Sequence, residues 1–316
     1  MTNRSKAEEI DRLNFIFTKE FQKFDTNIVI KELKEKGYFS FTNALTKKAA
    51  RKIEQDSTES KLTLNNNKIS GLHYERQYFL TNLLTTSKEF YDFVTSKFVF
   101  SICKKYLGNT FRLKCQRYYE THGGHHMQWH TDNKDATGPA SVPGLIFIFY
   151  TSDVNDGQLQ YIEGSHTWSG KKLHSDYSDE FIEQNYKNKI IDFKLPSGSL
   201  IIYNTYGIHR AKPVSNKNFS RKSVFLQVDT EVNNAEPIIL DTKFISVMNN
   251  EIAMLLGFGK PSNYDAYPTT SLNTLPFSKN VFNIFSKYIM YRIMLRIFQF
   301  LPKSLKTYIK KVIKKN

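Results

Sequence analysis

The sequence has too few cysteines for a disulfide-stabilised protein. Only Cys103 and Cys115 occur among its 316 residues, and two cysteines cannot form the framework that holds small secreted domains together. The first ten residues, MTNRSKAEEI, also lack the charged-then-apolar pattern of a secretory signal peptide. We therefore expect a cytoplasmic protein whose thiols are reduced.

Long apolar segments are absent as well. No stretch of 18 or more residues is free of charged side chains, whereas a membrane-spanning helix needs about 20 predominantly apolar residues. The sequence therefore predicts no ordinary transmembrane helix. Disorder throughout the chain is also excluded, because 40% of the residues are apolar and 14% are aromatic, which is enough to bury a substantial core.

Acidic residues are missing from the C-terminal segment. Residues 277–316 contain ten lysines and arginines but no aspartate or glutamate. Removing these ten charges from the net charge of +15 leaves only +5 for the rest of the chain. Nucleic-acid binding by the body of the protein therefore gains little support from charge.

Short apolar or alternating segments fill the middle of the chain, among them LKCQRYY, LIFIFYT, SLIIYNT and SVFLQVD. The turn sequences DATGPASVPG, NDG and PSG separate them. Many short strands at this spacing predict a mainly β fold, a sandwich or jelly roll. We expect helical cladding with one strand over 1–112, the jelly-roll core over 113–232, a helix and linker over 233–276, and a basic amphipathic tail over 277–316.

Helical patterns flank the predicted strands. Apolar spacing indicates helices near 10–24, 28–36, 46–55 and 245–256. The hydrophilic segment 171–189 interrupts the strands, and we interpret it either as a surface insertion or as a lid over a pocket.

A candidate metal site lies in the segment MQWHTD. His130 and Asp132 are two residues apart on an expected strand, so both side chains leave the same face. His209 lies on a later strand that a jelly roll can bring alongside. Two imidazoles and one carboxylate on one side of a metal form the facial triad of non-haem Fe(II) oxygenases. The HxD spacing alone is common, so the interpretation depends on residues further along the chain.

A buried cation is predicted near this site. Arg221 stands twelve residues after His209 at the start of a strand, and Ser223 comes two residues later. A guanidinium pointing into the barrel is costly to bury unless it meets an anion, which a dicarboxylate co-substrate would supply. The alternative is an arginine on the surface at the start of a strand.

Four segments of the sequence resemble the phytanoyl-CoA dioxygenase family over roughly residues 30–232. They are His130-Thr131-Asp132, DGQLQYIEGSH, PSGSLIIYNTYGIHRAKPVSNKNFSR and KELKEKGYFSFTNALTKKAARKI. The resemblance implies a double-stranded β-helix, cupin-like in architecture, that uses Fe(II), 2-oxoglutarate and O2. It also implies that His130, Asp132 and His209 bind iron, and that Arg221, assisted by Ser223, holds the distal carboxylate of 2-oxoglutarate.

The same resemblance favours hydroxylation, with release of succinate and CO2. Halogenating relatives carry a small residue where this chain has Asp132, so the carboxylate argues against halogenation. The expected substrate is a small molecule, a lipid or a lipid-linked glycan. The resemblance does not extend to the tail beyond residue 276.

The sequence suggests roles for further residues near the triad. Gln128 shares the strand parity of His130, so we expect it to line the pocket. One of Tyr118 and Tyr119 should point inward, and we assign Tyr118 to the co-substrate site, with a core tyrosine as the alternative. The histidines of HGGHH, residues 122–126, fit a loop better than a second metal site. We do not make His166, in the GSH turn, a ligand.

The basic tail allows several partners. Arg292, Arg296, Gln299 and Lys303 are spaced as one polar stripe of a helix that Pro302 should break or kink. Such a helix could lie on the inner face of an anionic membrane. Packing against the barrel or a dimer contact is an equal alternative, nucleic acid is a lesser one, and the oligomeric state stays open.

Two functions from other classes compete with an enzyme. One is a jelly-roll module that binds metal and ligand without turnover, and the other is a membrane-surface scaffold whose functional part is the tail. The complete triad together with Arg221 argues against the first.

Overall fold

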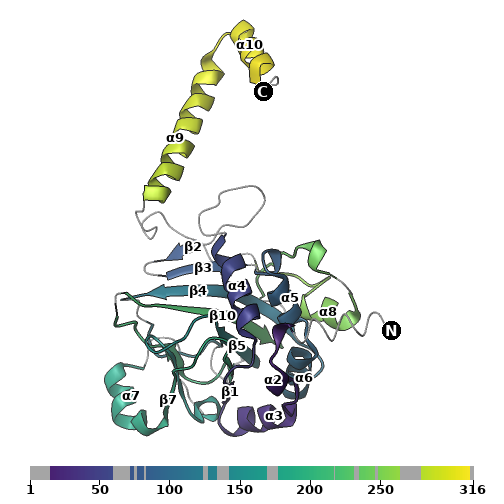
Figure 1. The fold of residues 1–316 in the computed structure, drawn as a ribbon, viewed down its shortest axis with the longest axis vertical. Coiled ribbons are helices and arrows are strands. Elements are labelled where there is room, and N and C mark those ends of the chain that lie inside the picture. The colour runs from purple at the N-terminus through teal and green to yellow at the C-terminus, as the bar shows by residue number, and fades with distance from the viewer. Residues whose placement is uncertain are drawn as a thin grey trace. The chain divides into compact units, whose positions relative to one another are not determined.

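The computed structural model divides the chain into two units, residues 1–274 and residues 275–316. Figure 1 shows the labelled elements. The described residues are 15–59, 72–74, 77–81, 83–123, 127–133, 142–168, 177–216, 218–230, 235–245, 248–263 and 279–313. We describe each unit by itself.

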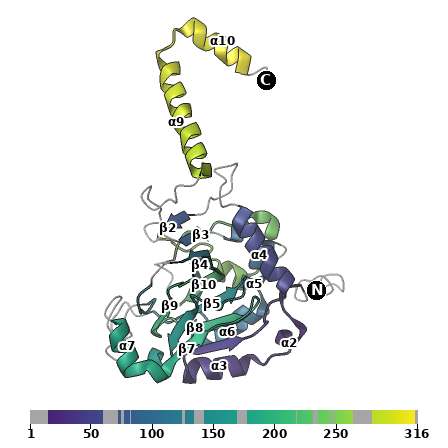
Figure 2. The ribbon, with the colours of Figure 1, turned by 60° about the vertical axis from the view of Figure 1, so that its left-hand side comes forward.

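In the described part of the first unit, seven strands form one antiparallel sheet in the order β1-β8-β5-β10-β4-β3-β2, the large sheet, seen in Figure 2. Its strands in chain order are β1 (Tyr38–Phe41), β2 (Leu72–Tyr74), β3 (Gln77–Thr81), β4 (Arg112–His122), β5 (Gly144–Tyr150), β8 (Leu200–Asn204) and β10 (Ser220–Asp229). Two of the turns between strands contain a glycine with positive φ: Gly157, just before the strand Leu159–Ile162, and Gly198, just before β8. These glycines lie in the predicted NDG and PSG turns.

A second, small sheet faces the large one. It contains β7 (Ile190–Phe193), β6 (Leu159–Ile162) and β9 (His209–Ala211), in that order. Two isolated antiparallel bridges extend it beyond β9, from His209 to His130 and from Trp129 to Tyr177. Inward side chains of both sheets, including Ile146 and Tyr203 of the large sheet and Tyr161 of the small sheet, form one buried cluster. This arrangement confirms the predicted jelly roll.

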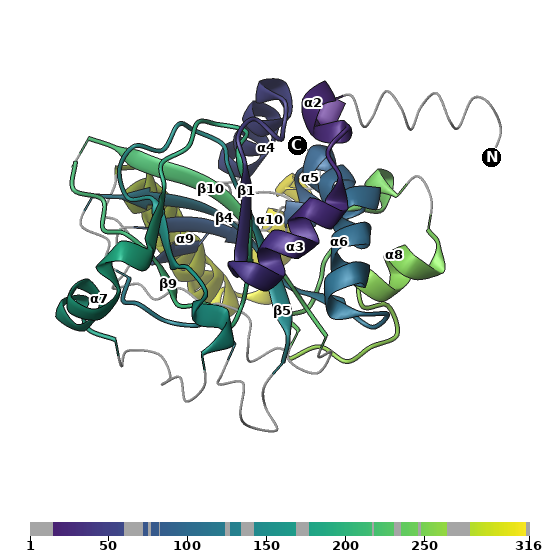
Figure 3. The same ribbon diagram turned by 90° about the horizontal axis from the view of Figure 1, so that it is seen from below.

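Helices cover the outer face of the large sheet. Figure 3 shows α2 to α6 together on this side of the molecule. The helices are α2 (Lys19–Gln22), α3 (Thr26–Glu35), α4 (Lys47–Glu59), α5 (Lys88–Val94), α6 (Lys97–Leu107) and α8 (Asn250–Leu255), with 3₁₀ turns η2 (Leu83–Thr85) and η5 (Thr242–Phe244). Side-chain caps fix several helix starts, for example Ser87 on Phe90 N and Ser96 on Val99 N.

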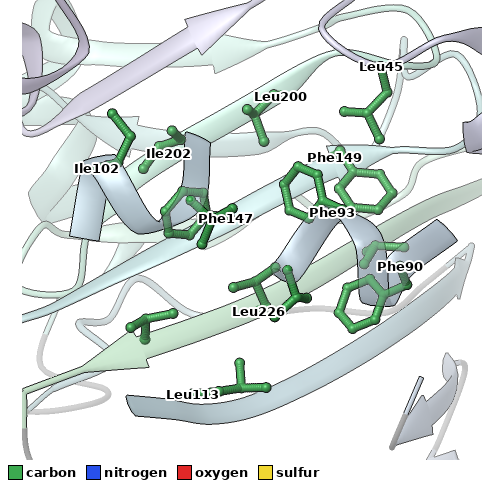
Figure 4. Close-up of a cluster of buried hydrophobic side chains, with 14 of the residues drawn as sticks. Leu45, Phe90, Phe93, Ile102, Leu113, Phe147, Phe149, Leu200, Ile202 and Leu226 are labelled. Atoms are coloured by element: carbon green, nitrogen blue, oxygen red, sulfur yellow. The ribbon is translucent and has the colours of Figure 1, made fainter. Parts of the chain in front are cut away.

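The main hydrophobic core lies between these helices and the large sheet. Figure 4 shows Phe93 of α5 and Ile102 of α6 beside Phe147 of β5 and Leu226 of β10. All four side chains are fully buried and belong to one continuous cluster. Burying one such side chain contributes roughly 1.5–3 kcal/mol. The helical cladding is therefore an integral part of the first unit's core.

The hydrophilic insertion packs on the outside of the small sheet. Its described part contains α7 (Asp179–Tyr186) and η4 (Lys187–Lys189), which lie away from α8 in Figures 1 and 3. Ile182 of α7 is fully buried against Ile162, Ile208 and Trp129. Of the two interpretations of this segment, its described part fits a surface insertion. Residues 169–176 lie outside the described residues.

Several elements differ from the prediction made from the sequence. Residues 129–130 form only isolated bridges where a strand was expected. The N-terminal part holds three strands that all join the large sheet, and only β1 was expected there. No element was expected at α5 or α6 either. Of the expected helix near 10–24, residues 1–14 lie outside the described residues, and α2 covers only Lys19–Gln22.

The C-terminal unit contains α9 (Lys279–Phe300) and α10 (Lys303–Ile313). The break at Pro302 confirms the predicted effect of this proline. Lys303 begins a separate helix, so the predicted four-residue polar stripe is wrong. No described helix is both long and apolar enough to span a membrane.

Candidate active site

A backbone hydrogen-bonded pair positions two histidines at the inner face of the small sheet. His130 N donates to His209 O over 3.0 Å, and His209 N donates to His130 O over 2.9 Å. Residues directly opposite in such an antiparallel pair present their side chains on the same face. The two imidazole centroids are accordingly 4.4 Å apart.

Asp132 completes the predicted triad just beyond this pair. Its backbone N donates to Thr205 O over 3.2 Å, which brings the turn after His130 beside the end of β8. Asp132 Oδ2 lies 3.0 Å from His209 Nε2, and Asp132 Oδ1 lies 3.8 Å from His130 Nε2. One ligand atom from each of the three residues lies within 4.8 Å of the others. The structure thus brings together all three predicted ligands.

Backbone carbonyls orient both imidazole rings. His130 Nδ1 is 2.7 Å from Gln128 O, and His209 Nδ1 is 3.0 Å from Gly207 O. Since a carbonyl only accepts, each Nδ1 carries the proton and each Nε2 presents a lone pair toward Asp132. Hydrogen bonds of this kind fix the tautomer of metal-binding histidines.

Electrostatics keeps the Asp132 carboxylate ionised. Burial by itself raises the pKa of Asp132, but His209, His130 and Lys114 outweigh it and lower this pKa to about 2. Burial lowers the pKa of His209, and the neighbouring Asp132 carboxylate outweighs that effect and raises it. When both rings are neutral, the three groups offer one negative carboxylate and two nitrogen lone pairs, a set suited to a divalent cation that replaces the imidazole protons.

A polar cluster that was not predicted from the sequence supports the Asp132 turn. Lys114 is the extra residue of a β-bulge, since Cys115 pairs with Gln227 and Leu113 pairs with Val228. Lys114 Nζ donates to Asn133 Oδ1 over 3.0 Å. Bulges redirect side chains in this way. The sequence carries no signal for a bulge here.

Asn133, next to Asp132, joins this cluster to β10. Its amide donates to Thr205 Oγ1 over 3.0 Å and to Asp229 Oδ2 over 3.3 Å, while Gln227 Nε2 donates to its Oδ1 over 3.1 Å. Asp229 can approach because position 144 is glycine, where a Cβ would lie 2.0 Å from Asp229 Oδ1. Asn133 therefore links the triad to the large sheet.

The GSH turn supports the other side of the triad. Ser165 Oγ accepts a hydrogen bond from Ile208 N over 2.8 Å, one residue before His209. His166 Nε2 bonds to Lys34 O at 3.1 Å, so His166 ties the turn to α3. Both contacts are structural, consistent with leaving His166 out of the ligand set.

Arg221 is buried on the inner face of β10. Its NH1 donates to Gly157 O, and its NH2 donates to Thr121 Oγ1 over 3.2 Å. Nε has no hydrogen-bond partner among the described residues. Burial lowers the pKa of Arg221, and the nearby phenols of Tyr150 and Tyr119 act in the opposite direction.

The other buried arginines differ in their partners. Arg112 donates to Pro261 O and Ser262 Oγ, whereas two others form ion pairs. Arg117 forms an ion pair with Glu236, and Arg210 forms one with Asp179. In the described part of the chain no carboxylate pairs with Arg221. A buried cation without a protein anion, and with one N–H directed at no acceptor, fits a site for an external carboxylate.

The strand register decides which tyrosine faces this cation. Ser223 lies opposite Tyr119 on β4 and Tyr150 on β5, so these residues share the inner face with Arg221. Tyr118 faces the other way and is buried in the core against the helices. The assignment of Tyr118 to the co-substrate site is therefore wrong, because neighbouring strand residues point to opposite faces. Tyr119 has the inward position.

The remaining predicted residues lie at the edge of the site. Gln128 is exposed. It contacts the triad through its backbone carbonyl, which accepts the hydrogen bond from His130 Nδ1. His122 is exposed and lies 3.3 Å from Glu120. The second-metal alternative involving His125 and His126 lies outside the described residues.

The chain belongs to the phytanoyl-CoA dioxygenase family, whose model matches residues 33–223. This match covers β1 to the middle of β10, and it includes the triad, Arg221 and Ser223. No curated protein sequence was found to match the chain.

Three solved structures, two of the protein HygX and one of the protein SnoK, share the fold at low sequence identity. HygX from Streptomyces hygroscopicus with nickel and 2-oxoglutarate is 12% identical, with a TM-score of 0.51 over 67% of this chain and 90% of HygX. HygX with nickel, 2-oxoglutarate and hygromycin B has 13% sequence identity and a TM-score of 0.52, again over 67% of this chain and 90% of HygX. SnoK, a non-haem α-ketoglutarate-dependent carbocyclase from nogalamycin biosynthesis, has 13% sequence identity and a TM-score of 0.50 over 66% of this chain and 85% of SnoK.

Proposed function

We propose that this chain is an Fe(II)- and 2-oxoglutarate-dependent oxygenase that hydroxylates a small molecule, a lipid or a lipid-linked glycan. Family membership supports the oxygenase class. One protein of similar fold, HygX, has been determined twice with nickel and 2-oxoglutarate bound, and nickel is a common substitute for iron at such sites.

The observation that carries the proposal is the presence of two complementary sites in one barrel. The triad offers two neutral imidazole nitrogens and one carboxylate, while Arg221 offers a buried cation without a protein carboxylate. A facial set of three protein ligands leaves other metal positions open to a chelating co-substrate. A purely structural metal site is closed by its protein ligands and needs no such cation.

The roles of the residues derive from this geometry. His130, Asp132 and His209 hold the metal, with both imidazoles fixed by the carbonyls behind them. Arg221 and Ser223 hold the distal carboxylate of 2-oxoglutarate. The iron and co-substrate together supply oxidation of a substrate C–H bond by O2, coupled to release of succinate and CO2. The buried apolar walls between the sheets exclude water from that chemistry.

Anaerobic titration tests the proposal directly. Adding Fe(II) and then 2-oxoglutarate to the purified chain should produce a visible metal-to-ligand charge-transfer band. The band should be absent in His209→Ala and present in His122→Ala, which removes an exposed histidine of the same unit. Absence of the band in the unmodified chain, with iron demonstrably bound, would exclude 2-oxoglutarate as a chelating co-substrate.

Turnover separates this function from a binding module. With O2 admitted, an oxygenase forms succinate in proportion to O2 consumed, whereas a non-catalytic binder shows the band and forms no succinate. Succinate formation that increases with one member of a panel of candidate substrates would also identify the substrate class. Detection of the oxidised product by mass spectrometry would establish whether the reaction is hydroxylation.

We also propose that the C-terminal unit binds the cytoplasmic face of an anionic membrane. The supporting observation is α10, in which Leu305 and Ile309 are four residues apart and Lys303 and Lys306 are three apart, so each pair shares one side of the helix. Apolar residues fall on one side of this helix and lysines on the other, as in helices that lie in the membrane interface. The whole segment after Pro276 carries no acidic residue.

Vesicle binding tests this localisation. The full chain should co-sediment with vesicles rich in phosphatidylserine at low salt, and less so at high salt because surface charges are screened. Truncation after Pro276 should abolish the binding. Retained binding by the truncated chain would place the membrane contact elsewhere, and dimerisation lost on truncation would favour a contact between copies instead.

A further inference from the structure

A buried tyrosine beside the triad has no role in the functions described so far. Tyr203 lies on β8 with its side chain between the two sheets, and its ring centroid is 4.6 Å from that of His209. Its hydroxyl is 3.2 Å from His209 Nε2. Only about 2% of this residue is exposed. His209 Nε2 is the hydrogen-bond partner of the Tyr203 hydroxyl among the described residues.

The direction of this hydrogen bond is set by the other side of the imidazole ring. His209 Nδ1 carries a proton because it faces Gly207 O. Nε2 also lies 3.0 Å from Asp132 Oδ2. In the neutral ring, the form that binds a metal, Nε2 is an acceptor, and the Tyr203 hydroxyl donates to it.

Metal binding removes this acceptor. The Nε2 lone pair that accepts from Tyr203 is the one that His209 offers to the metal, and one lone pair cannot serve both. A buried donor left without an acceptor is unfavourable, so the hydroxyl needs a new partner within its reach. Once the metal is in place, oxygen atoms of a chelating co-substrate would bind at the same centre.

We propose that the Tyr203 hydroxyl is a hydrogen-bond donor to the metal-chelating end of 2-oxoglutarate, released from His209 when the metal binds. This inference rests on the proposed function, since it assigns a further binding residue to the same site. Arg221 holds one end of the co-substrate and Tyr203 orients the other. The phenol also makes metal binding and co-substrate binding favour each other, because the first frees the donor that the second uses.

The neighbouring tyrosine provides a matched control. Tyr161 lies on the facing sheet, its ring centroid 5.8 Å from that of Tyr203, and it is equally buried in the same cluster. Its hydroxyl lies against Gly207, where a Cβ would be only 1.8 Å from it, and no described hydrogen bond joins it to an imidazole nitrogen of the triad. Tyr161→Phe therefore removes a phenol from the same core without removing a donor to the chelate.

The test compares Tyr203→Phe with Tyr161→Phe in the anaerobic titration. Phenylalanine keeps the ring, so Fe(II) affinity without co-substrate should be unchanged or slightly higher in Tyr203→Phe. Its 2-oxoglutarate affinity should fall roughly two- to tenfold, the range for one lost hydrogen bond. The charge-transfer band should move to higher energy, because a donor to the keto acid lowers the energy of its acceptor orbital. Tyr161→Phe should show neither change.

The outcomes distinguish this inference from the proposed function. An unmodified chain that forms the band, combined with a Tyr203→Phe variant of identical band energy and co-substrate affinity, overturns the role of Tyr203 and leaves the oxygenase intact. Weaker Fe(II) binding in Tyr203→Phe before co-substrate is added also overturns it, since the phenol would then act on the ligand set itself. Failure of the unmodified chain to form the band overturns the proposed function.

Discussion

The two sheets of the barrel contribute different parts of the candidate site. His209 comes from the three-residue strand β9 of the small sheet, and His130 is bridged to it. Arg221 and Ser223 come from β10, a ten-residue strand with partners on both sides. The arrangement of the candidate metal ligands thus depends on one short backbone pair and its supporting side chains, whereas the residues proposed to bind the co-substrate stand on a long ladder. We therefore expect iron binding and co-substrate binding to be separable by mutation.

The largest expected effect comes from the metal side. His130→Ala and His209→Ala each remove one of three protein ligands, so bound iron and Fe(II)-dependent succinate formation should both fall to background. Metal analysis after desalting and a coupled succinate assay measure the two. Circular dichroism should show a folded chain, because the backbone pair does not need either imidazole. Normal iron content and turnover in either variant would remove that histidine from the triad.

On the co-substrate side, Arg221→Ala should raise the dissociation constant for 2-oxoglutarate by roughly ten- to a hundredfold, through loss of charge-assisted hydrogen bonds. Iron content should stay normal, because no described contact joins Arg221 to the triad. Titration of the charge-transfer band measures the constant. The control is Lys222→Ala, which removes the next cation on β10, paired with Glu54 on the opposite face. Equal effects of both variants would contradict a specific carboxylate site.

Asn133 connects the Asp132 turn to β10, so its replacement should affect both metal binding and the stability of the large sheet. Asn133→Ala leaves Asp229, Gln227 and Lys114 with fewer partners, and we expect a loss of about 1–3 kcal/mol in the free energy of unfolding. Iron affinity should fall roughly ten- to a hundredfold, as for other residues that support metal ligands. Denaturant unfolding and iron competition with a chelator measure these. Unchanged iron affinity would show that the Asp132 turn is held without Asn133.

The smallest effect on the site is expected from the tail. Truncation after Pro276 removes α9 and α10, a unit separate from residues 1–274. Iron content, 2-oxoglutarate affinity and the thermal midpoint should each stay close to those of the full chain. Scanning calorimetry and the band titration provide the comparison. A large drop in the thermal midpoint would show that the tail packs on the barrel and would favour a structural role over membrane binding.

The sequence predicted the parts of the fold and site that depend on local patterns. Alternating apolar segments located most of the core strands, and the HxD spacing with a distant histidine located the triad. Strands β2 and β3 were missed because they are short and join the sheet only at its edge. Their places depend on long-range pairing with β4, which no local pattern encodes.

The errors at the site have the same origin. Tyr118 and Tyr119 are adjacent, and only the register between β4 and β10 decides that Tyr119 is inward. Lys114 reaches Asn133 through a bulge, and Tyr203 reaches His209 through the turn between β8 and β9. Strand alternation marked Tyr203 only as one residue of a buried strand. Its contact with the ligand set became apparent from the distances.

The backbone pairing at the metal site has a consequence for how the chemistry of such a barrel can diversify. His130 and His209 are locked by reciprocal backbone hydrogen bonds, whereas Asp132 stands beyond the bridge and is held there by its own N–H. Any residue except proline can supply that N–H, so the side chain at position 132 can change while the two imidazoles keep their places. The metal centre therefore has two constant positions and one exchangeable one. A single substitution at the exchangeable position alters the ligand set without requiring a new fold.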